Sequence, residues 1–249
     1  TQGIVAVIEQ AAAGLVPGRV HHGVGEIPVS EPVAFNRVID AYEANADVIT
    51  NMEMERLASP TGPTGGKIVR ASDGNAPTNV AFIQCAGSRD NNHLPYCSAV
   101  CCMGSLKQAR YVREKLPEAK VTIFYIDIRT MGRHEGFYYE LLADENVTFV
   151  KGKVARVNPV GGALKVEVED TLGGKLLADR HDLVVLATGV VPNNADVPFE
   201  GAAADEYGFI MPGNDGLHGV GCARRPTDVS RAVKDSTAAV LRAIQDVRK

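Results

Sequence analysis

The chain has 249 residues, of which 45% are hydrophobic and 22% are charged. This composition supports one large domain or two small ones and excludes a disordered or collagen-like chain. The formal net charge is −4, with acidic and basic residues interspersed, so we expect no nucleic-acid partner. The apolar stretches are far shorter than the roughly 20 residues of a membrane-spanning helix. No secretion signal is recognisable either, and we expect a cytoplasmic protein without a direct membrane span.

The first part of the chain predicts little regular structure. Residues 1–36 contain a short apolar, helix-like start and then glycine- and proline-rich sequence, which predicts an irregular lead-in. Residues 35–57 have apolar side chains at helical spacing around residues 48–49, which predicts two helices flanking a short extended piece. Residues 58–78 are turn-rich and predict a loop with one short strand at 67–70.

A βαβ unit follows this loop. The apolar run at residues 79–85 predicts a buried strand, residues 99–116 have helical periodicity, and residues 120–126 predict a second strand. Such a crossover is right-handed and its two strands lie in one parallel sheet. Residues 136–143 and 147–150 then predict another helix and a third strand.

The pattern next changes to hairpins. Residues 153–157, 163–168 and 175–178 alternate with glycine-rich turns, which predicts a three-stranded antiparallel meander. A buried strand at 182–189 follows and ends in Ala-Thr-Gly. The last segment predicts a short strand at 217–220 and a helix from about 227 to 247. Strands that alternate with helices around this meander predict an α/β fold.

Four of the five cysteines lie close together, in the pattern C-x11-C-x3-C-C, where a strand ends and a helix begins. This clustering does not fit the disulfide framework of a secreted protein. Four thiolates suit zinc or an iron–sulfur cluster, because both bind soft anionic sulfur. Adjacent cysteines are awkward around one tetrahedral ion but can serve two corners of a cubane, which favours iron–sulfur. The four residues are Cys85, Cys97, Cys101 and Cys102.

The surroundings of these cysteines fit an anionic group. A helix that begins near Val100 would direct its N-terminal dipole and free N–H groups at the cluster. Arg89 and Lys107 would add positive charge. Two other interpretations remain open: Cys85 can be an ordinary buried thiol, and the two adjacent cysteines can form a vicinal disulfide.

Two late segments are similar to flavin-binding elements of two-dinucleotide-binding-domain flavoproteins. They are Ala-Thr-Gly at 187–189 and Gly-Cys at 221–222 before a helix. The alternative for the first is a strand that simply ends in a tight turn. The early glycine-rich phosphate motif is missing, because Gly-Val-Gly at 23–25 lacks a third glycine and a preceding strand. The glycine-rich loop at 62–67 is one residue short of a P-loop.

From about Val48 to its end, the chain resembles the flavin-bearing A subunit of heterodisulfide reductases. It is especially similar to the A subunit of the quinone-interacting membrane-bound oxidoreductase complex. Together the matching segments extend over about four fifths of the chain. They are VITNMEMERL (48–57), GPTGGKIVRASDG (62–74), FIQCAGSRD (82–90), YCSAVCCMGSLK (96–107), FYIDIRT (124–130) and GCARRPTDV (221–229).

The resemblance implies a thioredoxin-reductase-like fold with two dinucleotide-binding domains and bound FAD. In this chain the N-terminal flavin phosphate-binding βαβ unit is expected to be missing or incomplete. Residues 1–78 would form an irregular and helical lead-in that is part of the flavin domain. Residues 79–180 would form an NAD-domain-like βαβ unit plus β-meander that carries the four-cysteine site. Residues 181–249 would supply late flavin-domain elements and the C-terminal helix.

The resemblance also implies site residues. The four cysteines would hold a 4Fe–4S cluster, and Lys107 and Glu55 would approach the flavin ring, where a cation stabilises reduced, anionic flavin. Cys222 stands where many related flavoproteins have Asp, and we interpret it as a flavin neighbour. The residues that match the family's late flavin-contact segments are Thr188, Gly189, Gly221, Cys222, Asp228 and Val229.

We therefore expect an oxidoreductase subunit that relays electrons between FAD and a 4Fe–4S cluster in a multisubunit, heterodisulfide-reductase-like complex. Electron bifurcation, a homodimer and membrane association through another protein of the complex are further options. Direct use of NAD(P)H is not favoured, because Cys85 and Gly-Ser-Arg-Asp stand where a glycine-rich turn would bind the nucleotide. Two alternatives stay open: a pyridine-nucleotide disulfide reductase with a Cys101–Cys102 dithiol, and a zinc-stabilised scaffold.

Overall fold

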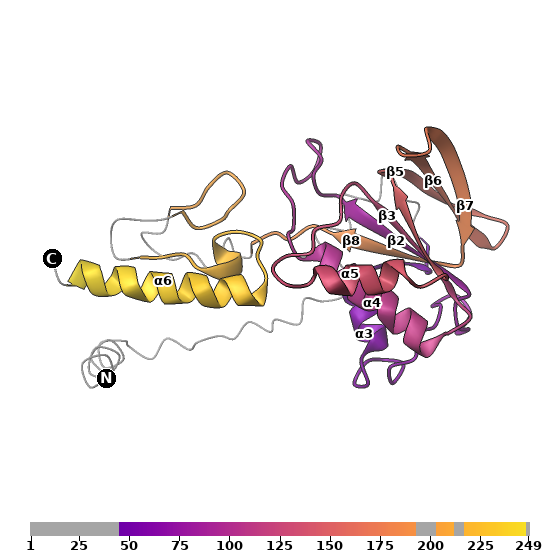
Figure 1. The fold of residues 1–249 in the computed structure, drawn as a ribbon, viewed down its shortest axis with the longest axis horizontal. Coiled ribbons are helices and arrows are strands. Elements are labelled where there is room, and N and C mark those ends of the chain that lie inside the picture. The colour runs from indigo at the N-terminus through magenta and orange to yellow at the C-terminus, as the bar shows by residue number, and fades with distance from the viewer. Residues whose placement is uncertain (1–44, 193–202, 212–216, 248–249) are drawn as a thin grey trace. The chain divides into compact units, whose positions relative to one another are not determined.

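A computed structural model describes residues 45–192, 203–211 and 217–247 (Figure 1). Five strands form one sheet in the order β1-β8-β2-β3-β4, and every neighbouring pair is parallel. The last of these strands along the chain thus lies between the first two. The strands are β1 (Val48–Thr50), β2 (Asn79–Ala86), β3 (Lys120–Tyr125), β4 (Val147–Lys151) and β8 (Leu183–Thr188). The predicted α/β class and parallel βαβ unit are confirmed.

Helices cover one face of this sheet (Figure 1). They are α3 (Asn51–Ala58), α4 (Cys101–Lys115) and α5 (Glu135–Leu142). Helix α3 starts directly after β1 with a capping box: Glu53 N–H donates to Thr50 Oγ1 over 3.2 Å, and Thr50 N–H donates to Glu53 Oε2 over 2.6 Å. The two reciprocal bonds satisfy free donors at the helix start, so strand and helix can follow each other without a loop.

A three-stranded antiparallel sheet covers the other face. It consists of β5 (Val154–Val160), β6 (Ala163–Asp170) and β7 (Lys175–His181), with β6 in the middle. This is the predicted meander. Its side chains share a core with the central sheet, because alternate residues of a strand point to opposite faces.

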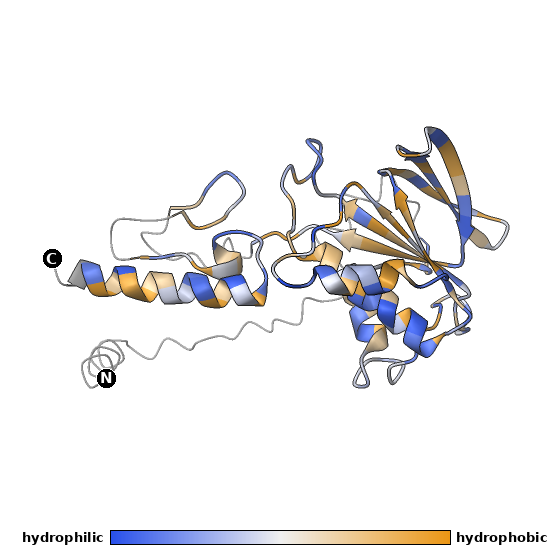
Figure 2. Cartoon of the chain, in the orientation of Figure 1, coloured by the Kyte–Doolittle hydropathy of each residue, from blue (hydrophilic) through white to orange (hydrophobic). Residues whose placement is uncertain are grey.

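Strand β2 shows this alternation clearly. Val80 and Phe82 pack in the core beneath the helices, whereas Ala81 and Ile83 pack against the meander. A strand covered on both faces is apolar throughout, as expected for a parallel sheet. Figure 2 shows the strands of the central sheet in hydrophobic colours, while the helices are banded.

The C-terminal part contains a single-turn 3-10 helix, η1 (Gly221–Ala223), and helix α6 (Val229–Val247). The predicted C-terminal helix is therefore confirmed. No helix in the described ranges is long and apolar enough to cross a membrane.

Two predicted strands are wrong. Residues 67–70 form no strand, because Arg70 N–H donates to Asn75 O and Gly74 N–H donates to Arg70 O, which makes a turn. Ile68 is nevertheless buried in the helix-side core, which explains its apolar character. Residues 217–220 form no strand either; Gly219 packs closely on Ile210, and no strand in the described ranges pairs with this segment. The helix predicted before residue 48 falls almost wholly outside the described residues.

His181, at the end of β7, makes stability depend on pH. Its side chain is only 2% exposed, packs edge-on against Phe124, and pairs through Nδ1 with Asn79 Oδ1 at 3.0 Å. Burial lowers the pKa of His181 from 6.5 to about 4. The unfolded chain therefore takes up this proton at a higher pH than the folded chain does.

We predict that the free energy of unfolding falls by roughly 3 kcal/mol through this group as the pH drops from 6.5 to 4. Urea denaturation at several pH values measures it. His181→Leu should flatten the pH dependence in this window, whereas His134→Gln, at an exposed site, should retain it. If the free energy of unfolding depends on pH equally in the wild type and in His181→Leu, the prediction is contradicted.

Candidate cofactor site

The cysteine site lies where the strand order of the parallel sheet reverses. Strand β2 continues through α4 to β3 on one side, whereas β8 and β1 lie on its other side. Open α/β sheets bind ligands beyond the carboxyl ends of their strands at such a point. Cys85 is at this end of β2, and Cys101 and Cys102 open α4, as predicted.

A β-bulge directs Cys85 toward the site. Ile83 pairs with Leu186 and Ala86 with Thr188, so two residues of β2 stand opposite the single residue Ala187 of β8. Cys85 is one of these two, and its backbone is left-handed, with φ of 58°. Bulges of this kind reorient a side chain next to functional sites. The extra residue lets the Cys85 thiol turn away from the meander.

Backbone strain concentrates in this segment. In the described residues, three non-glycine residues have positive φ: Cys85 at 58°, Arg89 at 53° and Ala99 at 60°. This conformation is costly for residues with a Cβ atom and tends to persist at functional sites. All three lie between the end of β2 and the start of α4, within the segment that carries the cysteines.

The four thiols interact with one another. Burial, then the neighbouring Cys101 and Cys97, raises the pKa of Cys85 to about 11. A hydrogen bond from Cys102 lowers the pKa of Cys101, and the same bond raises the pKa of Cys102. The thiol of Cys85 also acts on that of Cys102. The structure therefore places Cys97, Cys101 and Cys102 within electrostatic range of Cys85.

The N-terminus of α4 favours negative charge on these sulfurs. No side chain caps the helix at Val100, so its first N–H groups are available, and the backbone of Cys101 and Cys102 helps to lower the pKa of the Cys101 thiol. Ala99 N–H donates to Cys97 Sγ over 3.3 Å. Free N–H groups and the helix dipole stabilise thiolates.

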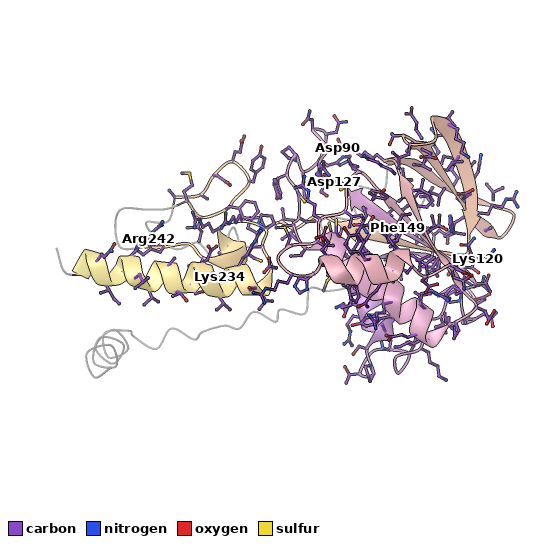
Figure 3. The ribbon with its side chains drawn as sticks, in the orientation of Figure 1. Asp90, Lys120, Asp127, Phe149, Lys234 and Arg242 are labelled. Carbon is purple, nitrogen blue, oxygen red and sulfur yellow. The ribbon has the colours of Figure 1, made fainter. Side chains whose placement is uncertain are left out.

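Two guanidinium groups add to this effect. Arg89 counteracts the rise of the Cys85 pKa, and Arg129 lies within electrostatic range of Cys97 and Cys102. Asp127 holds both in place: its Oδ1 accepts from Arg89 Nη1 at 2.5 Å and from Arg129 Nε at 3.3 Å. Figure 3 labels Asp127 beyond the carboxyl end of β3, at the opposite end of that strand from Lys120.

Sequence reasoning missed the role of Asp127 and assigned none to Ser88 or Gln84. The available signal was the position of Asp127 and Arg129 directly after a parallel strand that neighbours β2. The hydroxyl of Ser88 and both amide atoms of Gln84 are buried, without a hydrogen-bond partner among the described residues.

The donor chemistry fits an iron–sulfur cluster. Soft thiolates are gathered beside free N–H groups, two guanidinium groups and unpartnered buried polar atoms, all of which suit a polynuclear anionic group. No three His, Cys, Asp or Glu side chains in the described ranges are arranged around a single metal-ion position.

The predicted flavin neighbours Lys107 and Glu55 form an ion pair between α4 and α3, with Nζ and Oε1 2.7 Å apart. Gln108 Nε2 donates to Glu55 Oε2 over 3.1 Å and to Asn51 O over 2.8 Å. The Lys107 side chain is 46% exposed, so its ammonium is accessible from outside.

Thr188 and Gly189 lie at the end of β8, close to the cysteine loop. Thr188 Oγ1 donates to Asn51 Oδ1 over 3.2 Å, which ties β8 to the start of α3. A Cβ atom at Gly189 would lie 2.5 Å from Leu94 Cδ1 and 3.4 Å from Ser88 Cβ. A larger residue here would therefore require the Leu94 side chain to shift.

The other predicted flavin contacts lie around the start of α6. Gly221 has φ of 55° and packs against Ala232 of that helix. Asp228 Oδ1 accepts from Arg231 N–H over 2.9 Å, which caps the helix. Cys222 and Val229 are exposed, and Cys222 Sγ lies 3.6 Å from Thr227 O. Each residue thus has a local contact or an open surface, and their flavin roles stay predictions.

Fold and site together define a parallel α/β protein with a cysteine-rich candidate cofactor site at the strand-order reversal. No protein-family model matches the chain. The second iron-sulfur A subunit of the CoB–CoM heterodisulfide reductase of Methanopyrus kandleri is 40% identical over 219 residues, which are 81% of this chain and 33% of that protein. The A subunit of the ferredoxin/F420H2-dependent CoB–CoM heterodisulfide reductase of Methanosarcina acetivorans is 38% identical over 217 residues, 80% of this chain and 27% of that protein.

Over these matched residues, the chain belongs to the family of heterodisulfide reductase A subunits. It spans about a third of the length of the curated relatives it matches. Among solved structures, it is similar to T. acidophilum thioredoxin reductase, with a TM-score of 0.49 and 15% identity over 82% of this chain and 59% of that chain.

Gly189→Ala should destabilise the fold by about 1–3 kcal/mol, because the added methyl group overlaps Leu94. Urea denaturation measures this change. The double variant with Leu94→Ala should lose less than the sum of the two single variants, since the obstructing side chain is gone. Strict additivity would contradict the proposed packing.

Proposed function

We propose that this chain is an electron-transfer module that relays electrons between FAD and a 4Fe–4S cluster within a heterodisulfide-reductase-like complex. The observation that carries the proposal is the electrostatic coupling of Cys85 to the other three cysteines, two of which open the uncapped helix α4, with Arg89 and Arg129 in range of these thiols. Relatives whose names include reductase and iron-sulfur subunit support it.

The chemistry divides between the two groups: FAD exchanges electron pairs, and an iron–sulfur cluster transfers single electrons. The chain's own residues hold and tune them. We propose Cys85, Cys97, Cys101 and Cys102 as the cluster ligands. The guanidinium groups and the first N–H groups of α4 offset the negative charge of the thiolates.

Lys107 is proposed to lie beside the flavin ring. It follows Cys102 by five residues on the same helix, which is about 7.5 Å along the axis. Its accessible ammonium, oriented by Glu55, would stabilise anionic reduced flavin. Flavin and cluster would then be close enough for direct electron transfer. Thr188, Gly189, Gly221, Cys222, Asp228 and Val229 are proposed to complete the flavin site.

The proposed partners are other subunits of such a complex, because the relatives are named as A subunits of multisubunit reductases. Electron bifurcation, a homodimer, a quinone-interacting complex and a cytoplasmic location stay predictions.

Anaerobically purified protein should contain about four iron and four acid-labile sulfide per chain, as a cubane requires. Cys85→Ser, Cys97→Ser, Cys101→Ser and Cys102→Ser should each lower iron and sulfide strongly and reduce visible absorption. Cys222→Ser, at an exposed site outside the set, should retain both. Iron, sulfide, zinc and flavin are measured on one sample.

Other results would favour the alternatives. Zinc without sulfide would indicate a zinc-stabilised scaffold. An iron-free protein that turns over disulfides with NAD(P)H would indicate a Cys101–Cys102 dithiol, which the opposite pKa shifts of these two adjacent thiols would support. Unchanged iron in the cysteine variants would contradict the ligand set.

Lys107→Met should lower the midpoint potential of the bound flavin, because it removes a cation that favours the anionic reduced form. Spectroelectrochemical titration measures the shift. Lys115→Met is the matched control on the same helix, because the Lys115 ammonium bonds instead to Ala58 O and Gly66 O. An unchanged potential in Lys107→Met would remove this residue from the flavin site.

A further inference from the structure

Gln84 carries a buried amide group that the fold does not satisfy. The residue is only 2% exposed, and neither Oε1 nor Nε2 has a hydrogen-bond partner among the described residues. An unpaired buried amide destabilises a protein unless a ligand or water takes up its bonds. Strand position 84 would otherwise suit an apolar residue, like those before it in β2.

The register of the sheet puts this amide beside the cysteines. Gln84 follows Val80 and Phe82 in alternation, so it points to the helix-covered face. It shares the bulge with Cys85, opposite Ala187. The Ala187 side chain packs directly against Cys101 and Cys102. The register therefore puts Gln84 on the helix-covered face of the sheet, opposite the residue that packs against Cys101 and Cys102.

We propose that the Gln84 amide donates a hydrogen bond to a sulfur atom of the cluster and thereby raises its reduction potential. Gln84 is a positioning residue in this role, and the inference rests on the proposed function. A donor stabilises the more negative, reduced cluster more than the oxidised one. A neutral amide can donate this hydrogen bond at every pH, because its protons do not titrate.

The test is Gln84→Met, which retains the length of the side chain and removes the donor. We expect the equilibrium constant for cluster reduction to fall about tenfold, which is about 59 mV for a one-electron couple. Redox titration followed by electron paramagnetic resonance measures it. In the cluster-free protein, the same variant should raise the urea midpoint, because the unpaired amide is gone.

Ile83→Val is the matched control. This neighbour on β2 is equally buried but faces the meander, so its loss of a methyl group should lower stability and leave the potential unchanged. A merely structural role of Gln84 would change stability in Gln84→Met without moving the potential. That result would overturn the inference while the cluster assignment survives.

The two failures are distinguishable. A wild-type protein without iron and sulfide overturns the proposed function, and the Gln84 inference with it. If Gln84→Met does not retain its cluster, the hydrogen bond is tested instead in wild-type protein with 15N-labelled glutamine side chains. A hyperfine coupling from an amide nitrogen to the reduced cluster would support the hydrogen bond, and its absence would overturn it.

Discussion

Gathering four thiols in one place is the constraint on which the rest of this structure depends. Thiolates repel one another and lose solvation when buried. For this reason burial, together with the neighbouring Cys101 and Cys97, raises the pKa of Cys85. The fold offsets this cost with N–H groups at the start of α4 and with two guanidinium groups held by Asp127. The left-handed residues near these cysteines are the conformational cost of the same arrangement.

The elements with the most regular patterns were predictable from sequence. The β2-α4-β3 unit, the meander and α6 all follow from periodicity and turn residues, because burial on one or two faces determines these patterns. The strands predicted at 67–70 and 217–220 are wrong because an extended, apolar stretch such as that around Ile68 can be buried without any neighbouring strand. A hydrophobic pattern indicates only that a segment is buried, whereas a β-strand also needs a neighbouring strand to which it can hydrogen-bond.

The clustering of the cysteines along the chain was likewise readable from the sequence, whereas the charged groups around them were not. Asp127 reaches Arg89 from the end of the neighbouring strand, and Gln84 stands beside Cys85 in a bulge, so the strand order and the register place them rather than any motif. Gly189 is similar: sequence favours a flavin role or a turn, while the structure adds a packing reason in Leu94. Only the three-dimensional structure distinguishes a glycine that is required for packing from one that serves a turn or a flavin.

The position of β8 has a consequence for how the protein is made. Strand β2 ends at Ala86 and β8 begins only at Leu183, yet β8 completes the sheet between β1 and β2. Until residues 183–188 leave the ribosome, β2 lacks one partner, and Cys101 and Cys102 lack the Ala187 surface. Long-range pairing of this kind forms late. The sheet beneath the cysteine site is therefore complete only after residues 183–188 have been synthesised.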